Sequence, residues 1–217
     1  MVQIDMKSKI IPLLIGTHML ATACCTTIYE KDEVKRHGGM RNVSVKVAYD
    51  EEYAHKAKNR AHIAIVEKAS KSLEEQVGIR LVIKGESYWD SDDCQKSMYQ
   101  ARKELESEVG HESENGKCEI LIGFTGQGYE REEKDETGKT RTFTILGIAE
   151  GIGTGNSILV WGDYEFPGRV TIHELGHLLG AEHTAELSVM REEPACEKLD
   201  EKNKEIILKN KFRWFYE

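Results

Sequence analysis

The chain has 217 residues, of which 31% are charged and 39% are hydrophobic. This length allows one or two domains and favours one, with enough apolar residues for a packed core. The formal net charge is −8, from 30 Lys and Arg against 38 Asp and Glu. Such an acidic balance argues against a nucleic-acid partner, which would require a basic face.

The first 23 residues have the layout of an export signal. Lysines precede an apolar run at residues 10–20 that is too short to span a bilayer, and small residues follow up to Ala23. We therefore expect a signal peptide over residues 1–23 and a location outside the cytoplasm. Initiation at Met6 in place of Met1 would give the more regular start of such a signal.

Two alternatives remain open for the mature N-terminus. The small residues before Cys24 resemble a bacterial lipoprotein cleavage site, which would leave a lipid anchor on Cys24. Leu20 lies one residue farther from Cys24 than the usual lipoprotein pattern places it, so free secretion is the alternative. Residues 24–42 are polar and predict a flexible tether.

Three cysteines lie beyond this junction, namely Cys94, Cys118 and Cys196. In an oxidising compartment, three cysteines form at most one internal disulfide, and the sequence leaves all three pairings open. No two of them are closely spaced, so we do not expect a second zinc site.

The first part of the body predicts a strand, a long helix and a second strand. Valines alternate with polar residues over residues 43–47, as in a strand with one buried face. Asp50 is a candidate N-cap for a helix that runs to about Gln76 and ends at Gly78. Residues 79–83 then predict the second strand.

A helix is expected after Ser91, with Asp92 and Asp93 in its first turn, where their charge suits the helix dipole. The charged, glycine-containing residues 126–139 predict a solvated loop. A closing helix is expected within residues 198–210, followed by an apolar tail. Further strands are expected at residues 118–124, 142–149 and 157–161.

The most specific pattern in the chain reads H-E-x-x-H-x-x-G-x-x-H and starts at His173. His173 and His177 are four residues apart, so on a helix they project from one face and can bind one metal ion. Glu174 then lies beside the metal, where a general base would polarise a zinc-bound water. Gly180 permits a backbone turn that brings His183 in as the third ligand. The flanking residues are apolar, as a buried active-site helix requires.

This motif resembles the signature of the metzincin clan of zinc endopeptidases, in which a methionine-bearing turn follows the third histidine. Met190, seven residues past His183, is the candidate for that methionine, which forms an apolar floor beneath the metal in the family. Thr184 is closer to the Ser that matrixins carry after the third histidine than to the Asp of other members. The strand pattern is most similar to reprolysin-like (adamalysin-like) catalytic domains, so both subfamilies stay open.

The resemblance implies an α+β metzincin (zincin) fold with a mixed, mostly parallel twisted sheet, an active-site helix and a small C-terminal subdomain. We expect the catalytic domain at residues 43–217, with its N-terminal subdomain at 43–180 and its C-terminal subdomain at 181–217. The stretch from Leu146 is similar to the edge strand that borders the cleft in the family. We therefore expect an extended peptide substrate to pair with Gly147, Ile148 and Ala149. The alternative is that this stretch is an ordinary core strand.

The function implied is a secreted or lipid-anchored zinc endopeptidase with one catalytic Zn²⁺. It would be a monomer that hydrolyses protein or peptide substrates by Glu174-assisted attack of zinc-bound water. Many metzincins carry a long pro-domain, and the short tether leaves no room for one. The alternative is a catalytically silent, extracellular binding protein of the same fold. No residue pattern specifies the substrate.

Overall fold

The computed structural model describes residues 38–57, 61–92, 94, 97–134, 137–150, 156–162, 165–213 and 215. The expected signal peptide, both candidate start methionines and Cys24 lie outside these residues. Within the described ranges, no helix has the length and apolar character needed to cross a membrane. The chain from Arg41 onward is already in a strand, so the predicted tether is wrong for its last two residues.

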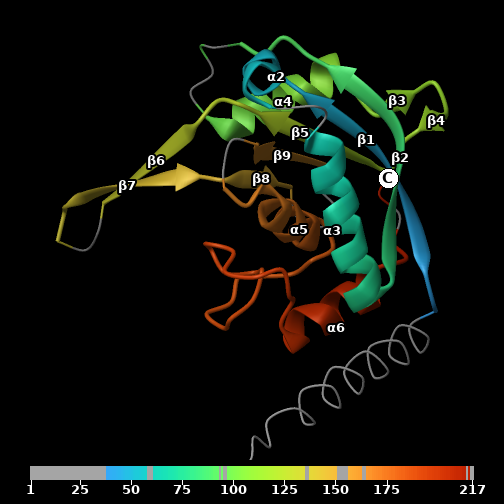
Figure 1. Ribbon diagram of the computed structural model, residues 1–217. Coiled ribbons are helices and arrows are strands. Elements are labelled where there is room, and N and C mark those ends of the chain that lie inside the picture. Colours follow the sequence, from blue (N-terminus) through green and yellow to red (C-terminus); the bar gives the residue numbers. More distant parts are fainter. Residues whose placement is uncertain are drawn as a thin grey trace, which may run out of the picture.

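A five-stranded sheet forms the centre of the molecule (Figure 1). Adjacent strands are parallel except at one edge, where the last strand runs antiparallel to its neighbour. The mixed, mostly parallel sheet expected from the sequence is therefore confirmed. In spatial order the strands are β2 (Ile79–Tyr88), β1 (Arg41–Tyr49), β5 (Ile120–Thr125), β9 (Ser157–Trp161) and β8 (Gly147–Ala149).

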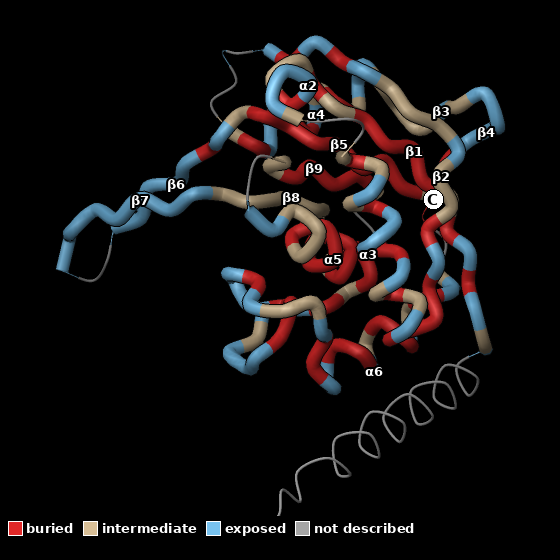
Figure 2. Tube along the Cα trace, viewed as in Figure 1, coloured by how far each residue is buried: buried red, intermediate tan, exposed pale blue. Residues whose placement is uncertain are grey.

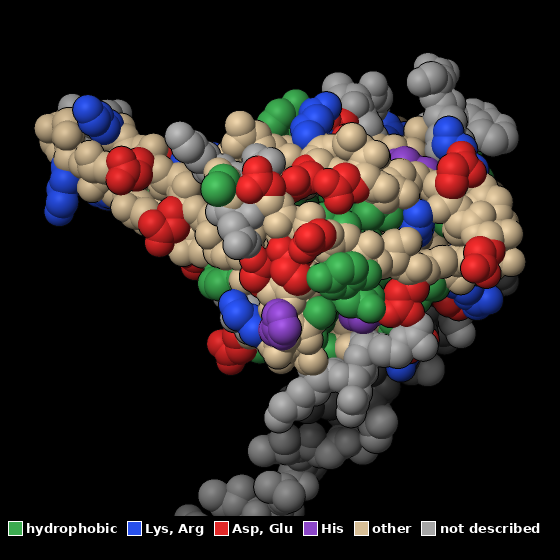
Figure 3. All heavy atoms as spheres, turned by 90° about the horizontal axis from the view of Figure 1, so that it is seen from above, with side chains coloured by type: hydrophobic (Ala, Val, Ile, Leu, Met, Phe, Trp, Pro, Cys, Tyr) green, Lys and Arg blue, Asp and Glu red, His purple; other side chains and the backbone are tan. Residues whose placement is uncertain are grey.

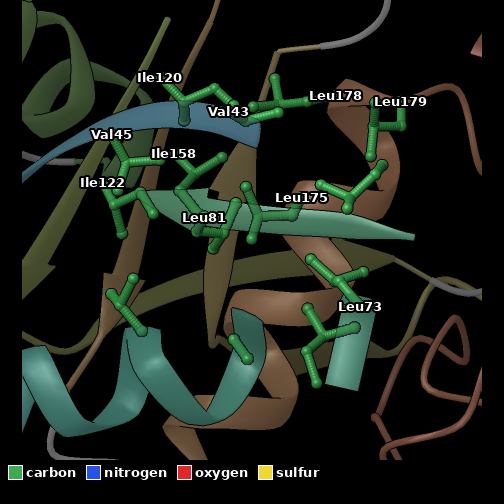
Figure 4. Close-up of a cluster of buried hydrophobic side chains, with 14 of the residues drawn as sticks. Val43, Val45, Leu73, Leu81, Ile120, Ile122, Ile158, Leu175, Leu178 and Leu179 are labelled. Atoms are coloured by element: carbon green, nitrogen blue, oxygen red, sulfur yellow. The ribbon is translucent and has the colours of Figure 1, made fainter. Parts of the chain in front are cut away.

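Helices cover both faces of the sheet, so its central strands are buried on both sides. Every residue of β5 is buried, as a continuous apolar run predicts for a strand between two layers. One face packs against α3 (Ala61–Val77) and α5 (Pro167–Leu178), and Figure 4 shows this cluster. The other face packs against α4 (Met98–Glu108). In Figure 2 the buried residues, drawn in red, lie mainly along the central strands and α5.

The segment after α5 lies below the sheet and leads into α6 (Glu201–Asn210) (Figure 1). This helix contacts α3, and its Ile207 and Leu208 are buried in the main cluster. Phe215 is also buried there, which agrees with the apolar tail expected from the sequence.

The single long helix predicted from Asp50 is wrong, because the structure has two helices. Asp50 does cap α2 (Glu51–Lys56), and its side chain accepts a hydrogen bond from the backbone of Tyr53. The helix ends at Ala57, whose backbone is extended. Between Tyr53 and the apolar start of α3, no large apolar side chain is present to pack on the sheet, so burial does not favour a continuous helix.

The predicted start of the next helix is also wrong. Asp92 lies ahead of α4 and not in its first turn, whereas Asp93 lies outside the described residues. Ser97 is the N-cap, and its hydroxyl accepts from the backbone of Gln100. The apolar spacing that is buried against the sheet begins only at Met98, which explains why the helix starts there.

The loop predicted at residues 126–139 is wrong for residues 129–134, although most of this segment is exposed to solvent as expected. Two strands, β6 (Tyr129–Lys134) and β7 (Thr140–Ile145), form an exposed hairpin that extends from the body (Figure 2). The strand expected over residues 142–149 is divided into β7 and β8 at Leu146. Charged residues on both faces of the hairpin remove the apolar alternation by which strands are predicted.

Two smaller features complete the fold. A short hairpin, β3 (Glu112–Ser113) and β4 (Gly116–Lys117), lies beside β2 and was not predicted. Among the described residues, no disulfide joins Cys94, Cys118 and Cys196, of which Cys118 is buried.

Candidate metal centre

Helix α5 carries His173 and His177 on one face, as their spacing predicts. Their Nε2 atoms are 3.0 Å apart. The Nε2 atom of His183 lies 3.1 Å from that of His173 and 3.2 Å from that of His177. Within the described part of the chain, these three histidines are the one group of potential metal ligands whose donor atoms converge.

Hydrogen bonds on the far side of two rings set their tautomers. Nδ1 of His173 lies 2.8 Å from the carbonyl oxygen of Val189, and Nδ1 of His177 lies 2.9 Å from that of Ala181. Because a carbonyl only accepts, each Nδ1 carries the proton and donates it, and each Nε2 keeps a lone pair. Such second contacts orient metal-binding histidines and raise their basicity as ligands.

The spacing of the three nitrogens fits a zinc ion. Tetrahedral zinc with Zn–N bonds of about 2.0–2.1 Å places its ligand nitrogens about 3.3–3.4 Å apart. The Nε2 atoms of His173, His177 and His183 are 3.0–3.2 Å apart, close to that value. Lone pairs brought so close repel one another, and a cation between them removes this repulsion.

Burial also favours the neutral form of the imidazoles, which is the form that binds a metal. Desolvation is the main cause that lowers the pKa of His173 to about 4, with a contribution from the two neighbouring histidines. Desolvation likewise lowers the pKa of His177. His183 is exposed, so the site opens to solvent on one side and leaves room for a further ligand.

The turn that follows α5 places the third histidine and a methionine. Gly180 has a φ of 90°, the left-handed conformation expected of a glycine that ends a helix. The chain then returns beneath α5, where the backbone N–H of Thr184 donates to the carbonyl of Met190 over 3.0 Å. Met190 is fully buried and lies against Gly176 of α5, and its role as the family's apolar floor stays a prediction.

Sequence reasoning missed the partner of this methionine. A Cβ placed on Gly176 would lie 2.7 Å from Sδ of Met190, so the methionine packs against bare helix backbone. The available signal was a glycine inside a helix, where it costs roughly 1 kcal/mol relative to alanine and usually has a packing reason.

Glu174 is buried beside β8. A Cβ placed on Gly147 would lie 2.6 Å from Oε1 of Glu174, so the first residue of β8 touches the proposed general base. Burial raises the pKa of Glu174 to about 8. Ile148 and Ala149 continue β8 at the edge of the sheet and are partly exposed. The three residues expected to line a substrate cleft thus lie along one edge strand next to Glu174.

A second missed residue is Asn203 of α6. Its side chain bonds to both main-chain groups of Glu182, the residue just before the third histidine. No local pattern signals this contact, because the two residues lie in different parts of the chain.

Together, the mostly parallel sheet, the helix with converging histidines and the methionine turn define a metzincin-type zinc peptidase. The chain belongs to metallopeptidase family M12, whose reprolysin-type model matches residues 39–211. This match confirms the resemblance predicted from the motif, and it supports a zinc-dependent hydrolase acting on proteins or peptides. No curated protein matches the chain.

Two solved structures are similar in fold. Archaemetzincin from Methanopyrus kandleri is 14% identical, with a TM-score of 0.52 over 79% of this chain and 97% of the archaemetzincin chain. A chain from a chaperone–substrate complex is 12% identical, with a TM-score of 0.53 over 78% of this chain and 33% of that chain. At these identities the likeness concerns the fold.

Proposed function

We propose that this protein is an extracytoplasmic zinc endopeptidase that cleaves extended segments of polypeptide. One observation carries the proposal. The Nε2 atoms of His173, His177 and His183 lie within 3.2 Å of one another, and Glu174 follows His173 on the same helix. The edge strand β8 supports the choice of an endopeptidase, because an edge strand can pair with the middle of an extended chain.

Each residue has a role in this proposal. A bound Zn²⁺ would supply Lewis acidity, which lowers the pKa of water toward neutrality and polarises a carbonyl oxygen. Glu174 accepts a proton from the attacking water and passes it to the leaving amine. The buried position of Glu174 against Gly147 holds its carboxyl group in place for both transfers. The main chain of β8 holds the substrate extended.

The location is proposed from the first 23 residues, whose layout is that of an export signal. The exported protein is either secreted after cleavage near Ala23 or anchored to the membrane by a lipid on Cys24. Mass spectrometry of the mature N-terminus distinguishes the two, since a lipidated cysteine adds the mass of its acyl chains. An uncleaved N-terminus found in the cytoplasm would contradict both.

Zinc content and casein cleavage, with and without a chelator, test the activity. We expect about one zinc per chain and cleavage that is lost on chelation and restored by Zn²⁺. Glu174→Gln should keep its zinc and lose several orders of magnitude, roughly 10³-fold or more, in kcat/KM. His173→Ala should lose zinc and activity together.

The outcomes separate the enzyme from the silent binding protein. A zinc-loaded wild type that cleaves neither casein nor a peptide library would favour the silent protein. Near wild-type turnover by Glu174→Gln would refute the role given to that residue.

A further inference from the structure

The hairpin β6–β7, which we call the β-arm (residues 129–145), extends from the body on the side of β8 (Figure 1). All of β6 after Tyr129 is exposed, and so is β7 up to Ile145. Seen from above, charged side chains stand along the arm (Figure 3). Neither the metal centre nor the packing of the core accounts for this feature.

The β-arm continues directly from the strand that borders the metal centre. Only Leu146 separates β7 from β8, and its carbonyl accepts from the backbone N–H of Trp161 at the end of β9 over 2.8 Å. Tyr129 is buried at the base of the arm, where its hydroxyl donates to Oε1 of Gln127 over 2.6 Å. The arm is therefore anchored to the sheet, and its direction is set by β8.

The register of the β-arm separates its side chains onto two faces. Because side chains alternate along a strand, Arg131 and Phe143, which are paired, share a face with the next pair, Glu133 and Arg141. The other face carries Glu130 and Glu132 opposite threonines. Phe143 is 44% exposed, an aromatic side chain among the polar and charged residues of the outer part of the arm.

Strand β7 has the features of a pairing template. It forms a two-stranded sheet with β6, its register shows no bulge, and no proline interrupts it. Thr and Phe favour extended backbone. Proteins usually protect an exposed strand edge with bulges, prolines, charged side chains or a covering segment, and β7 itself carries a single charged residue, Arg141. Among the described strands, only β6 pairs with β7, and an edge of this kind is suited to adding a strand from another chain.

We propose that the β-arm is an exosite for the substrate, in which β7 pairs with the part of an unfolded polypeptide that continues beyond β8. This inference rests on the proposed peptidase function and specifies its substrate class as long, unfolded segments of protein. A six-residue strand spans about 20 Å, so roughly six additional substrate residues reach the arm. Because the arm lies at one end of β8, these residues lie on one side of the scissile bond.

A shortened variant tests the proposal. Tyr129 and Ile145 face each other across the arm, so residues 130–144 can be replaced by Asn-Gly, the preferred two-residue hairpin turn. A casein cleavage site is first mapped by mass spectrometry. Peptides of about six, twelve and eighteen residues are then made around this site, and the longer ones are extended either toward the N-terminus or toward the C-terminus. Values of kcat/KM are compared for the full-length protein and the variant.

We expect the wild type to gain roughly tenfold in kcat/KM when the peptide is extended on one side, and the variant to show no gain. Cleavage of the shortest peptide should be equal in the two proteins, which shows that the metal centre is intact. Phe143→Ser should lose part of the gain, whereas Tyr88→Ser, an exposed aromatic on the opposite edge of the sheet, should lose none.

Several results would overturn the exosite. If the shortened variant loses the same factor in kcat/KM on short and long peptides, the arm only supports the cleft. If both proteins gain equally in kcat/KM with peptide length, the long substrate binds elsewhere. A dimer that disappears on shortening the arm would assign β7 to a second copy of the chain. If the wild type cleaves nothing, the proposed function itself has failed. If the shortened variant does not fold, Phe143→Ser with its Tyr88→Ser control decides the question.

Discussion

Asn203 holds the main chain of Glu182 at both of its hydrogen-bonding groups. The side-chain carbonyl accepts from the Glu182 N–H over 2.9 Å, and the side-chain amide donates to the Glu182 carbonyl over 3.0 Å. Asn203 is fully buried, and Oδ2 of Asp200 accepts from its amide as well. Since His183 follows Glu182 directly, α6 sets the position of the third candidate ligand.

We expect Asn203→Ala to weaken zinc binding by roughly 10- to 100-fold, as the loss of a residue that orients a metal ligand usually does. Competition with a chromogenic chelator measures this affinity. Lys202→Ala is the matched control, because Lys202 forms only an exposed ion pair with the Glu182 side chain. Equal effects of the two changes would show that Asn203 does not position the ligand.

The contact between Gly176 and Met190 leads to a prediction on stability. Gly176→Ala should be less stable than Gly168→Ala by about 1–3 kcal/mol, because its methyl group would press on the methionine sulfur. Gly168 lies in the same helix and faces open space, so alanine should be tolerated there. Urea unfolding of the zinc-loaded proteins measures both.

A double-mutant cycle with Met190→Ala isolates this contact. In that background, Gly176→Ala should no longer be destabilising, because the sulfur that it meets is gone. If Gly176→Ala lowers the free energy of unfolding equally with and without Met190→Ala, the strain does not come from the contact with the methionine.

Gly147→Ala should lower kcat/KM by about 10²-fold and leave zinc content unchanged. The new methyl group would lie 2.6 Å from both Oε1 of Glu174 and Cγ1 of Val170, so β8 and the carboxyl group must move apart. Small displacements of catalytic groups commonly cost this much. Thermal unfolding serves as the control for folding. A fully active variant would mean that β8 and Glu174 need not be in contact.

Arg102 should be important for stability, because it is fully buried and ties α4 to the ends of two strands. It bonds to Glu150, directly after β8, and its Nη1 donates to Ser157 of β9 over 2.5 Å and to Glu106 over 2.9 Å. Arg102→Met should cost about 3–5 kcal/mol, because it leaves carboxylates without their buried partner.

The neighbouring lysine provides the control for Arg102. Nζ of Lys103 lies 3.6 Å from the same Glu150 carboxylate but is half exposed, so Lys103→Met should cost less than about 1 kcal/mol. Guanidinium unfolding at neutral pH measures both variants. Similar costs would show that burial of the arginine does not decide its contribution.

Asp50 should make stability depend on pH. Its carboxyl group is buried, and burial raises its pKa from 3.8 to about 6. Between these two values the folded protein keeps a proton that the unfolded chain has released, so stability falls as pH rises through about 6. The contribution is complete below pH 3.8 and lost above the folded pKa.

Asp50→Asn stays uncharged and keeps an oxygen to accept from the backbone of Tyr53 and Gly126. Relative to the wild type, its unfolding free energy should rise by up to roughly 3 kcal/mol between acidic and neutral pH. All other groups titrate in both proteins and cancel in the difference. A difference that is independent of pH would show that Asp50 titrates as it does in the unfolded chain.

The metal centre was predictable where its residues are close in sequence. His173, Glu174 and His177 lie on one helical turn, so helix geometry alone brings them together. Gly180 marks the turn that follows, because its left-handed backbone strongly favours glycine. Strands with alternating or continuous apolar residues were predicted for the same reason, since burial leaves a local pattern.

Errors arose where the structure depends on contacts that leave no local pattern of apolar residues in the sequence. The β-arm is held by its own backbone ladder, so its charged residues show no strand periodicity and predicted a loop. The break after α2 depends on which side chains reach the sheet, and the start of α4 depends on which apolar residue first packs on it.

The sequence by itself identified the candidate metal ligands, the candidate general base, the fold class and the family, because their signals are local spacings along the chain. Only the tertiary structure showed that Met190 meets Gly176, that Asn203 positions the residue before His183, and that β7 extends the edge of β8. The first two contacts join segments whose separation in the sequence follows no period, so only the packing of helices on a common sheet brings them together. The third depends on the hairpin, whose charged residues carry no strand period.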